Sequence, residues 1–233
     1  SVVHRSLGPG TRNFAREPAM DRATAVAAIE IGITLAHELA ATGIALLGTG
    51  DMGIGNTTSS SAIVAAITGA PPSAVTGRGT GVDDLTLARK VSVIERAIST
   101  HAPHPDDPVG VLAAVGGFEI GGLAGLILGA ASRRIPIVID GFISGAAALI
   151  AAALAPVARD YMIAAHRSVE QGHRVVLERL ELAPLLNLDL RLGEGTGCAL
   201  VMPIIDAAAR IVREMATFQE AGVSERSEGA QIS

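Results

Sequence analysis

The stretch Ile44-Ala-Leu-Leu-Gly-Thr-Gly-Asp-Met-Gly-Ile-Gly-Asn-Thr-Thr58 decides the fold. Residues 44–47 form a short run of apolar side chains, which predicts a short buried strand. A glycine-rich turn over 48–56 follows, and we expect a helix from Thr57 to Ile67. A strand that turns directly into a helix opens a strand–helix–strand unit, so the stretch predicts an α/β fold.

The segments on either side continue this alternation of strands and helices. Helices are expected over about 19–41 and 199–219, and another should begin at Asp83 and Asp84 and continue to Ile98. A further helix over 107–131 is expected to be broken at glycines 116, 117, 121 and 122. Pro18 is expected in the first turn of the first helix. Three more strands are predicted over 135–139, 161–164 and 188–192. Together they predict a mainly parallel, Rossmann-like sheet flanked by helices, with residues 1–222 as one domain and 223–233 as a flexible tail.

The composition excludes several classes of protein. Of 233 residues, 49% are hydrophobic and 18% charged, with a mean hydropathy of +0.44, so the chain is not disordered. Aromatic residues make up 2%, too few for stacking on single-stranded nucleic acid. The net charge of −5 provides no general attraction to phosphate backbones or anionic membranes. We therefore expect a small-molecule or protein partner, with no nucleic acid and no membrane.

The single cysteine, Cys198, cannot form an internal disulfide, and the first residues do not read as a secretion signal. A cytoplasmic location is expected. The most membrane-like run, 141–158, is rich in alanine and glycine and barely reaches spanning length, which favours a buried helix. The six histidines lack paired metal-ligand spacing, so no metal site is expected.

Four polar segments follow the predicted strands: 48–58, 140–142, 166–168 and 193–197. In parallel sheets, ligands bind beyond the carboxyl ends of the strands. The first segment has the chemistry of an anion cradle, because its glycines expose backbone N–H groups where a helix begins. It is not a Walker motif, since no lysine follows the glycines. A glycine-rich turn between a strand and a helix is a plain structural connection about as often as it is a binding site. Arg78 and Gly79, in a neighbouring turn, offer further hydrogen-bond donors to an anion.

Two charged residues stand out. Lys90 is the only lysine among eighteen basic residues, and it is either a solvated surface residue or a phosphate ligand that arginine cannot replace. Glu194 lies between Gly193 and Gly195 after a predicted strand, where apolar neighbours would raise the pKa of a general base. Equally, Glu194 could simply stabilise the start of the last helix. Asp51 and Asp140 are expected to contact a ribose or to hold local structure.

Several motifs, in order, resemble one enzyme family. They are Gly50-Asp-Met-Gly-Ile-Gly-Asn-Thr-Thr58, Gly77-Arg-Gly-Thr-Gly81 with Ala88-Arg-Lys90, Val115-Gly-Gly-Phe-Glu-Ile120, Asp140-Gly-Phe142, His166-Arg-Ser168 and Leu190-Arg-Leu-Gly-Glu-Gly-Thr-Gly197. This set is similar to the nicotinate-nucleotide:dimethylbenzimidazole phosphoribosyltransferase family and covers nearly the whole chain.

The resemblance implies transfer of phosphoribosyl from nicotinate mononucleotide to 5,6-dimethylbenzimidazole, with inversion at the anomeric carbon, in the lower-ligand branch of cobalamin synthesis. It implies that Glu194 is the general base, that no metal or cofactor takes part, and that the protein is a homodimer. The residues expected to bind substrate are Asp51, Met52, Gly53, Ile54, Gly55, Asn56, Thr57, Thr58, Arg78, Gly79, Lys90, Asp140, Gly141, Ser168 and Leu192.

Two departures from the family pattern matter. Asp51 stands where the family usually has glutamate, a carboxylate one methylene longer. Family members also carry a further segment ahead of this region, which completes a small helical domain and part of the benzimidazole pocket, so only part of that domain is expected here. The chain is thus a fragment or a reduced relative, expected to bind the nucleotide but to turn over the base poorly. Two alternatives stay open: a non-catalytic nucleotide-binding or regulatory relative, and a transferase that uses another base.

Overall fold

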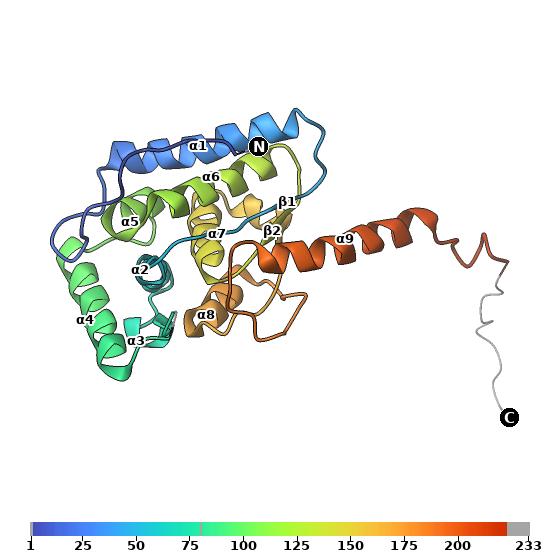
Figure 1. Ribbon diagram of the computed structural model, residues 1–233. Helices are drawn as coiled ribbons and strands as arrows, with labels where there is room; N and C mark the ends of the chain where they lie inside the picture. The colour runs from blue at the N-terminus through green and yellow to red at the C-terminus, as the bar shows by residue number, and fades with distance from the viewer. Residues whose placement is uncertain (1, 80, 223–233) are drawn as a thin grey trace, which may run out of the picture.

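A computed structural model describes residues 2–79 and 81–222. Within them, three strands form one parallel sheet in the order β1 (Leu47–Gly48), β2 (Ile137–Ile139) and β3 (Met162–Ala164). Buried β-branched residues fill β2, as expected for a strand covered on both faces. The predicted parallel α/β fold is therefore confirmed (Figure 1). The tail predicted over 223–233 lies outside the described residues.

Helices surround this sheet. They are α1 (Arg22–Ala40), α2 (Thr57–Thr68), α3 (Pro72–Val75), α4 (Asp84–His101), α5 (Pro108–Val115), α6 (Phe118–Ser132), α7 (Phe142–Leu154), the 3₁₀ helix η1 (Pro156–Tyr161), α8 (Gln171–Leu180) and α9 (Thr196–Glu214). Asp21 and Asp83 accept hydrogen bonds from backbone N–H groups in the first turns of α1 and α4, respectively, and so fix where these helices begin. Pro18 therefore precedes α1 rather than lying in its first turn.

The strand predicted over 188–192 is wrong. Asp189 has a left-handed backbone with φ of 52°, which an extended strand does not tolerate. The chain instead lies beside the end of β3 somewhat earlier, where the N–H groups of Leu185 and Leu186 donate to the carbonyls of Ala164 and Ala165. The last helix begins at Thr196 and ends at Glu214, so the predicted range 199–219 is also shifted.

The prediction that four glycines interrupt a helix over 107–131 is confirmed for two of them and wrong for the other two. Gly116 and Gly117 separate α5 from α6, but Gly121 and Gly122 lie inside α6 without interrupting it. The reason is packing: α6 lies directly against α1 (Figure 1), and a side chain at Gly125 would collide with the backbone of Ile29. Glycine here allows two helices to approach closely rather than ending one.

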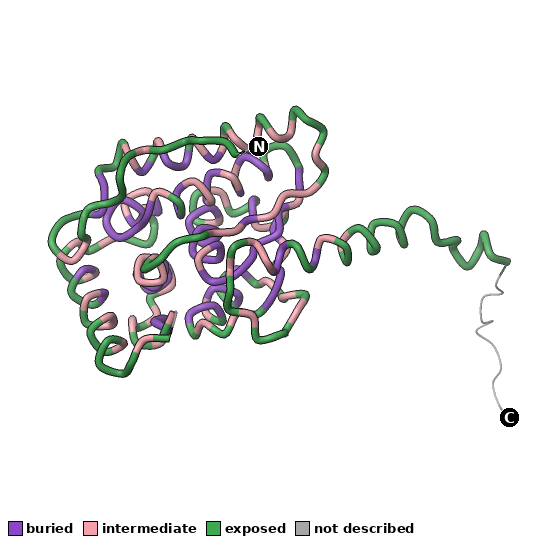
Figure 2. The backbone as a smooth tube through the Cα atoms, viewed as in Figure 1, coloured by how far each residue is buried: buried purple, intermediate pink, exposed green. Residues whose placement is uncertain are grey.

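The core lies between the sheet and α2, α5, α6 and α7 (Figure 2). The uncharged run beginning at residue 141 forms α7, most of which is buried inside the protein, as predicted. Among the described helices, α1 alone has the length and apolar composition of a membrane span; it packs along α6, and 28% of that apolar stretch is buried. By contrast, α9 extends away from the body and is exposed over most of its length.

The α1–α6 contact predicts opposite effects for two neighbouring glycines. Gly125→Ala would push a methyl group into the Ile29 backbone and is expected to lower the free energy of unfolding by about 1–3 kcal/mol. Gly122→Ala meets only an ordinary contact, 4.0 Å from the Ala28 carbonyl oxygen, and should be neutral or stabilising by up to about 1 kcal/mol. Urea denaturation of both variants tests this, and equal destabilisation would contradict the packing argument.

Candidate functional site

The carboxyl ends of the three strands meet through a buried polar network. Thr49, directly after β1, donates its hydroxyl to the Val138 carbonyl at 3.1 Å. The same hydroxyl accepts the N–H of Asp140 at 3.1 Å, and Asp140 directly follows β2. His166, shortly after β3, brings Nε2 within 3.6 Å of the Asp140 carboxylate. The predicted convergence of polar segments at this edge is therefore present.

The Asp140 carboxylate holds the start of α9. Its Oδ2 accepts the N–H of Gly195 at 3.0 Å and its Oδ1 accepts the N–H of Gly197 at 2.8 Å. The helix that follows Asp140 in sequence, α7, receives no side-chain cap. Asp140 therefore holds structure, one of the two roles expected for it, but the structure that it holds is a helix 57 residues further along the chain.

The turn that carries Glu194 contacts the glycine-rich loop directly. The N–H of Glu194 donates to the Asp51 carbonyl at 3.1 Å. A Cβ at Gly50 would lie 2.5 Å from the Gly195 nitrogen, so only glycine permits this approach. Glu194 itself has a φ of 60°, an unusual conformation for a residue with a side chain. Two separate loops therefore form one continuous surface.

A hollow of about 560 Å³ opens where these loops meet. Glu194 and Asp51 line it together with the apolar side chains of Met52 and Met202 and the Cys198 thiol. Glu194 is exposed, which corrects the expectation of apolar surroundings, because Leu192 and Leu200 beside it also face outward. The hollow therefore has a mixed lining of carboxylates, apolar methionine side chains and a thiol.

Carboxylates gather around this hollow. Burial raises the pKa of Asp51, and the nearby charges of Glu119, Asp140 and Glu194 raise it further. A hydrogen bond from the Asn56 amide to the Asp51 carboxylate acts in the opposite direction and lowers the pKa. Burial is the main cause of the increase, and the three neighbouring carboxylates place negative charge at this end of the site.

The other end of the site is basic. The Lys90 ammonium donates to the Thr57 hydroxyl at 2.7 Å, at the start of α2, and to the Gly77 carbonyl at 3.2 Å. Burial lowers the Lys90 pKa, and the Glu170 carboxylate partly opposes that shift. A Cβ at Gly79 would lie 3.2 Å from the Thr57 hydroxyl. The structure thus brings together the lysine, threonine and glycine that were expected to form one anion cradle.

Other predicted substrate-binding residues lie around this cradle or further away. Met52 and Ile54 are 82% and 96% exposed, on the loop with Gly53 and Gly55. Thr58 is half-buried in the first turn of α2, whereas the Arg78 guanidinium pairs with Asp84. Gly141 is buried beside His166, the Ser168 hydroxyl accepts the Glu170 N–H at 3.3 Å, and Leu192 is 66% exposed.

Sequence reasoning missed two charged residues near the cradle. The Glu170 carboxylate lies against Gly77, and the Arg191 guanidinium lies 4.0 Å from where a Cβ of Gly81 would be. Arg191 immediately precedes the Glu194 turn, so its position in the motif was the available signal. Glu170 had no such signal, because it opens α8, a helix that was not predicted.

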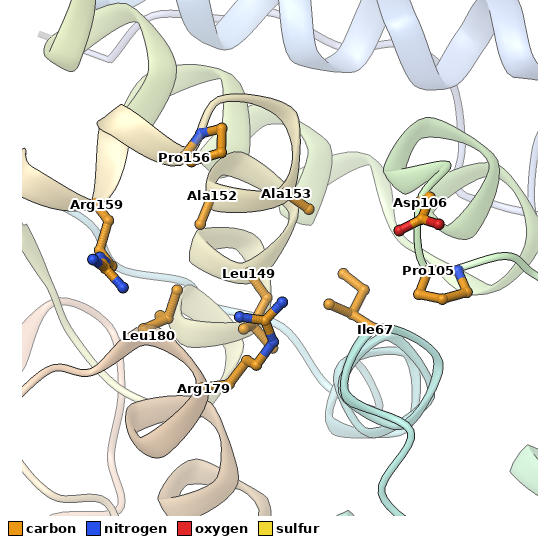
Figure 3. Close-up of a pocket in the computed structure, with 10 residues that line it drawn as sticks. All are labelled: Ile67, Pro105, Asp106, Leu149, Ala152, Ala153, Pro156, Arg159, Arg179 and Leu180. Carbon is orange, nitrogen blue, oxygen red and sulfur yellow. The ribbon is translucent and has the colours of Figure 1, made fainter.

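Another hollow lies outside this site. Its volume is about 410 Å³, and it lies near the carboxyl end of α7 between Arg159, Arg179 and several apolar side chains (Figure 3). None of the predicted site residues lines it. Within residues 2–79 and 81–222, no group of three or more His, Cys, Asp or Glu side chains could hold a metal ion. The candidate site is therefore the one at the strand ends.

The fold and site define an α/β protein whose candidate site lies at the carboxyl edge of a parallel sheet, with the Lys90 ammonium at the start of α2. The chain belongs to the phosphoribosyltransferase family, because a family model of that description matches residues 1–223. It is 64% identical over 227 residues to nicotinate-nucleotide–dimethylbenzimidazole phosphoribosyltransferase of Chloroflexus aggregans, in a match that spans 97% of this chain and 64% of the relative. The enzyme of the same name from Geobacter sulfurreducens is 61% identical, in a match that spans 96% of this chain and 64% of the relative.

A solved structure agrees with these relatives. The crystal structure of CobT from Thermus thermophilus superposes with a TM-score of 0.91 at 49% sequence identity, over 96% of this chain and 67% of that one. The resemblance inferred from the motifs is therefore confirmed. The chain spans about two thirds of the length of these relatives.

A buried histidine behind the site predicts acid sensitivity. Burial, and then the neighbouring His166, lower the pKa of His173 to about 4, and its Nδ1 accepts the Ser168 N–H at 3.0 Å. A basic group with a lowered folded-state pKa takes up its proton first in the unfolded state. The free energy of unfolding should therefore fall by about 3 kcal/mol as the pH drops from about 6.5 to 4.

Urea denaturation across this pH range measures the effect. His173→Gln should flatten the slope, whereas His4→Gln, at an exposed position, should leave it unchanged. An equal slope in His173→Gln and the unmodified protein would contradict the assignment.

Proposed function

We propose that residues 1–222 form one α/β phosphoribosyltransferase domain that transfers phosphoribosyl from nicotinate mononucleotide to 5,6-dimethylbenzimidazole. The products are α-ribazole 5′-phosphate and nicotinate, in the lower-ligand branch of cobalamin biosynthesis. The observation that carries the proposal is the hydrogen bond from Glu194 to the Asp51 carbonyl, which joins the base-bearing turn to the loop that leads into the Lys90 cradle. The names of the relatives supply the substrates.

The charges at the two ends of the site suit this nucleotide. Nicotinate mononucleotide carries a phosphate at one end of the ribose and a cationic pyridinium at the other. Lys90 and the start of α2 provide positive charge and N–H donors for the phosphate. Asp51 and its neighbouring carboxylates provide a negative field for the pyridinium and for the positive charge that develops on the ribose.

In the proposed reaction, one benzimidazole nitrogen attacks the anomeric carbon while the bond to the pyridinium nitrogen breaks. The pyridinium leaves as neutral pyridine, so its departure needs no acid. Glu194 accepts the proton from the other benzimidazole nitrogen, which keeps the new glycosidic product neutral at the ring. Inversion follows if the attack comes from the face opposite the leaving group.

The proposal includes a homodimer in the cytoplasm. The exposed apolar side chains of α9 favour association, among them Ile204, Ile211 and Val212. The buried, unpaired Cys198 suits a reducing compartment. The chain by itself is proposed to bind the nucleotide and to turn over the base poorly.

Glu194→Gln should lower kcat by about 10²–10⁴-fold, because the amide cannot accept the proton. The dissociation constant for nicotinate mononucleotide, measured by calorimetry, should change less than about twofold, and Glu30→Gln on the exposed face of α1 should match the unmodified protein. A variant with near-normal turnover would refute the base role. The unmodified chain should also be tested with a panel of bases. If it binds the nucleotide but turns over none of the bases, it is a non-catalytic relative. If it turns over a base other than 5,6-dimethylbenzimidazole, it is a transferase that uses another base.

Lys90→Met should weaken binding of nicotinate mononucleotide by about 10–100-fold through loss of a charge-assisted hydrogen bond to phosphate. Arg89→Met removes a neighbouring positive charge from an exposed position of the same helix and should leave affinity within about twofold. Calorimetric titration of both variants measures the difference. Equal losses would show a general charge effect instead of a specific cradle.

A further inference from the structure

The buried Asp140 carboxylate is the polar group at this edge whose role the proposed reaction leaves open. The residue is 2% exposed, and each of its two carboxylate oxygens already accepts a backbone N–H. A ribose hydroxyl would need exposed surface on this carboxylate, which the residue does not offer. The sequence-based expectation that Asp140 contacts substrate therefore needs a different reading.

The two N–H groups that Asp140 accepts belong to Gly195 and Gly197, immediately after Glu194. Between these glycines, α9 begins at Thr196. The Glu194 turn is thus fixed on one side by Asp140 and on the other by its own N–H donating to the Asp51 carbonyl. Without the Asp140 bonds, only the single bond to Asp51 and the turn itself would restrain a residue with a left-handed backbone.

The surroundings prevent Asp140 from moving. Its own N–H donates to the Thr49 hydroxyl at 3.1 Å, and the buried His166 ring lies against its carboxylate. A Cβ at Gly197 would collide with that ring and would lie 2.6 Å from Asp140 Oδ1. The carboxylate therefore lies in a rigid site formed by all three strand ends and the start of α9.

We propose that Asp140 is a positioning residue, whose buried carboxylate holds the turn that presents Glu194 to the acceptor base. The proposal rests on the proposed function for its catalytic consequence, but its structural part stands on the hydrogen bonds alone. A general base displaced by about 1 Å loses much of its effect, because proton transfer depends steeply on geometry.

A double-mutant cycle on the full chain separates positioning from substrate contact. Asp140→Asn keeps the shape but places an NH₂ group against one of the two glycine N–H donors, and it should lower kcat by about 10–100-fold while nucleotide affinity changes less than about twofold. In the Glu194→Gln background, the same substitution should cost less than about threefold. Full, multiplicative losses in both backgrounds, or a matching loss of nucleotide affinity, would overturn the proposal.

Asp160→Asn is the matched control, because it removes an exposed carboxylate in η1 far from the site. It should leave kcat unchanged. Thermal unfolding of each variant identifies any loss of fold. If Asp140→Asn does not fold, hydrogen exchange of the unmodified chain still tests the structural part of the proposal, because it requires no substitution.

Hydrogen exchange of the unmodified chain tests the structural part without activity. The N–H groups of Gly195 and Gly197 should exchange at least about tenfold more slowly than those of residues 189–192. Equal exchange would overturn the positioning role. If the unmodified chain lacks transferase activity but these N–H groups are protected, the proposed function fails while the Asp140 contact stands.

Discussion

The buried carboxylate of Asp140 is the constraint on which the site depends. A charge removed from water must be compensated by hydrogen-bond donors. The donors come from the start of α9, whose unpaired N–H groups and partial positive charge suit an anion. This requirement brings a helix from the end of the described chain onto the carboxyl ends of β1 and β2. The Glu194 turn is fixed because it directly precedes that helix.

Small residues then allow the loops to share one surface. Gly50 lets the β1 loop touch the Gly195 backbone, so the acidic and basic ends of the site lie on a single connected stretch. Lys90 reaches the same stretch through Thr57 at the start of α2. Asp51 and Lys90, which carry charges of opposite sign, thereby lie at different ends of this stretch. A ligand with an anionic and a cationic end fits such a field better than a simple anion does.

The sequence predicted the parts of this arrangement that depend on local pattern. The apolar strand before a glycine turn, the lone lysine and the Gly-Glu-Gly turn were visible because each is a departure from the surrounding composition. It did not predict contacts between distant segments: that Asp140 caps α9, or that Gly121 serves helix packing and not helix termination. The false strand at 188–192 shows the same limit, since its apolar pattern was correct while the backbone at Asp189 was not extended.

Glu194 and the start of α9 line the same hollow, and both Glu194 and most of α9 are exposed. Met202, in the second turn of α9, lines the same hollow as Glu194, and further along the helix Ile204 and Ile211 face solvent. An isolated helix with an uncovered apolar face gains little stability in water, so a covering surface is required for it to persist. This chain spans 64% of the length of the Chloroflexus aggregans relative, and the proposed homodimer supplies a second copy; a further segment or a second copy laid on α9 would also close the hollow. Closure would exclude water from the base and its acceptor, which is why the chain alone is proposed to bind the nucleotide better than it turns over the base.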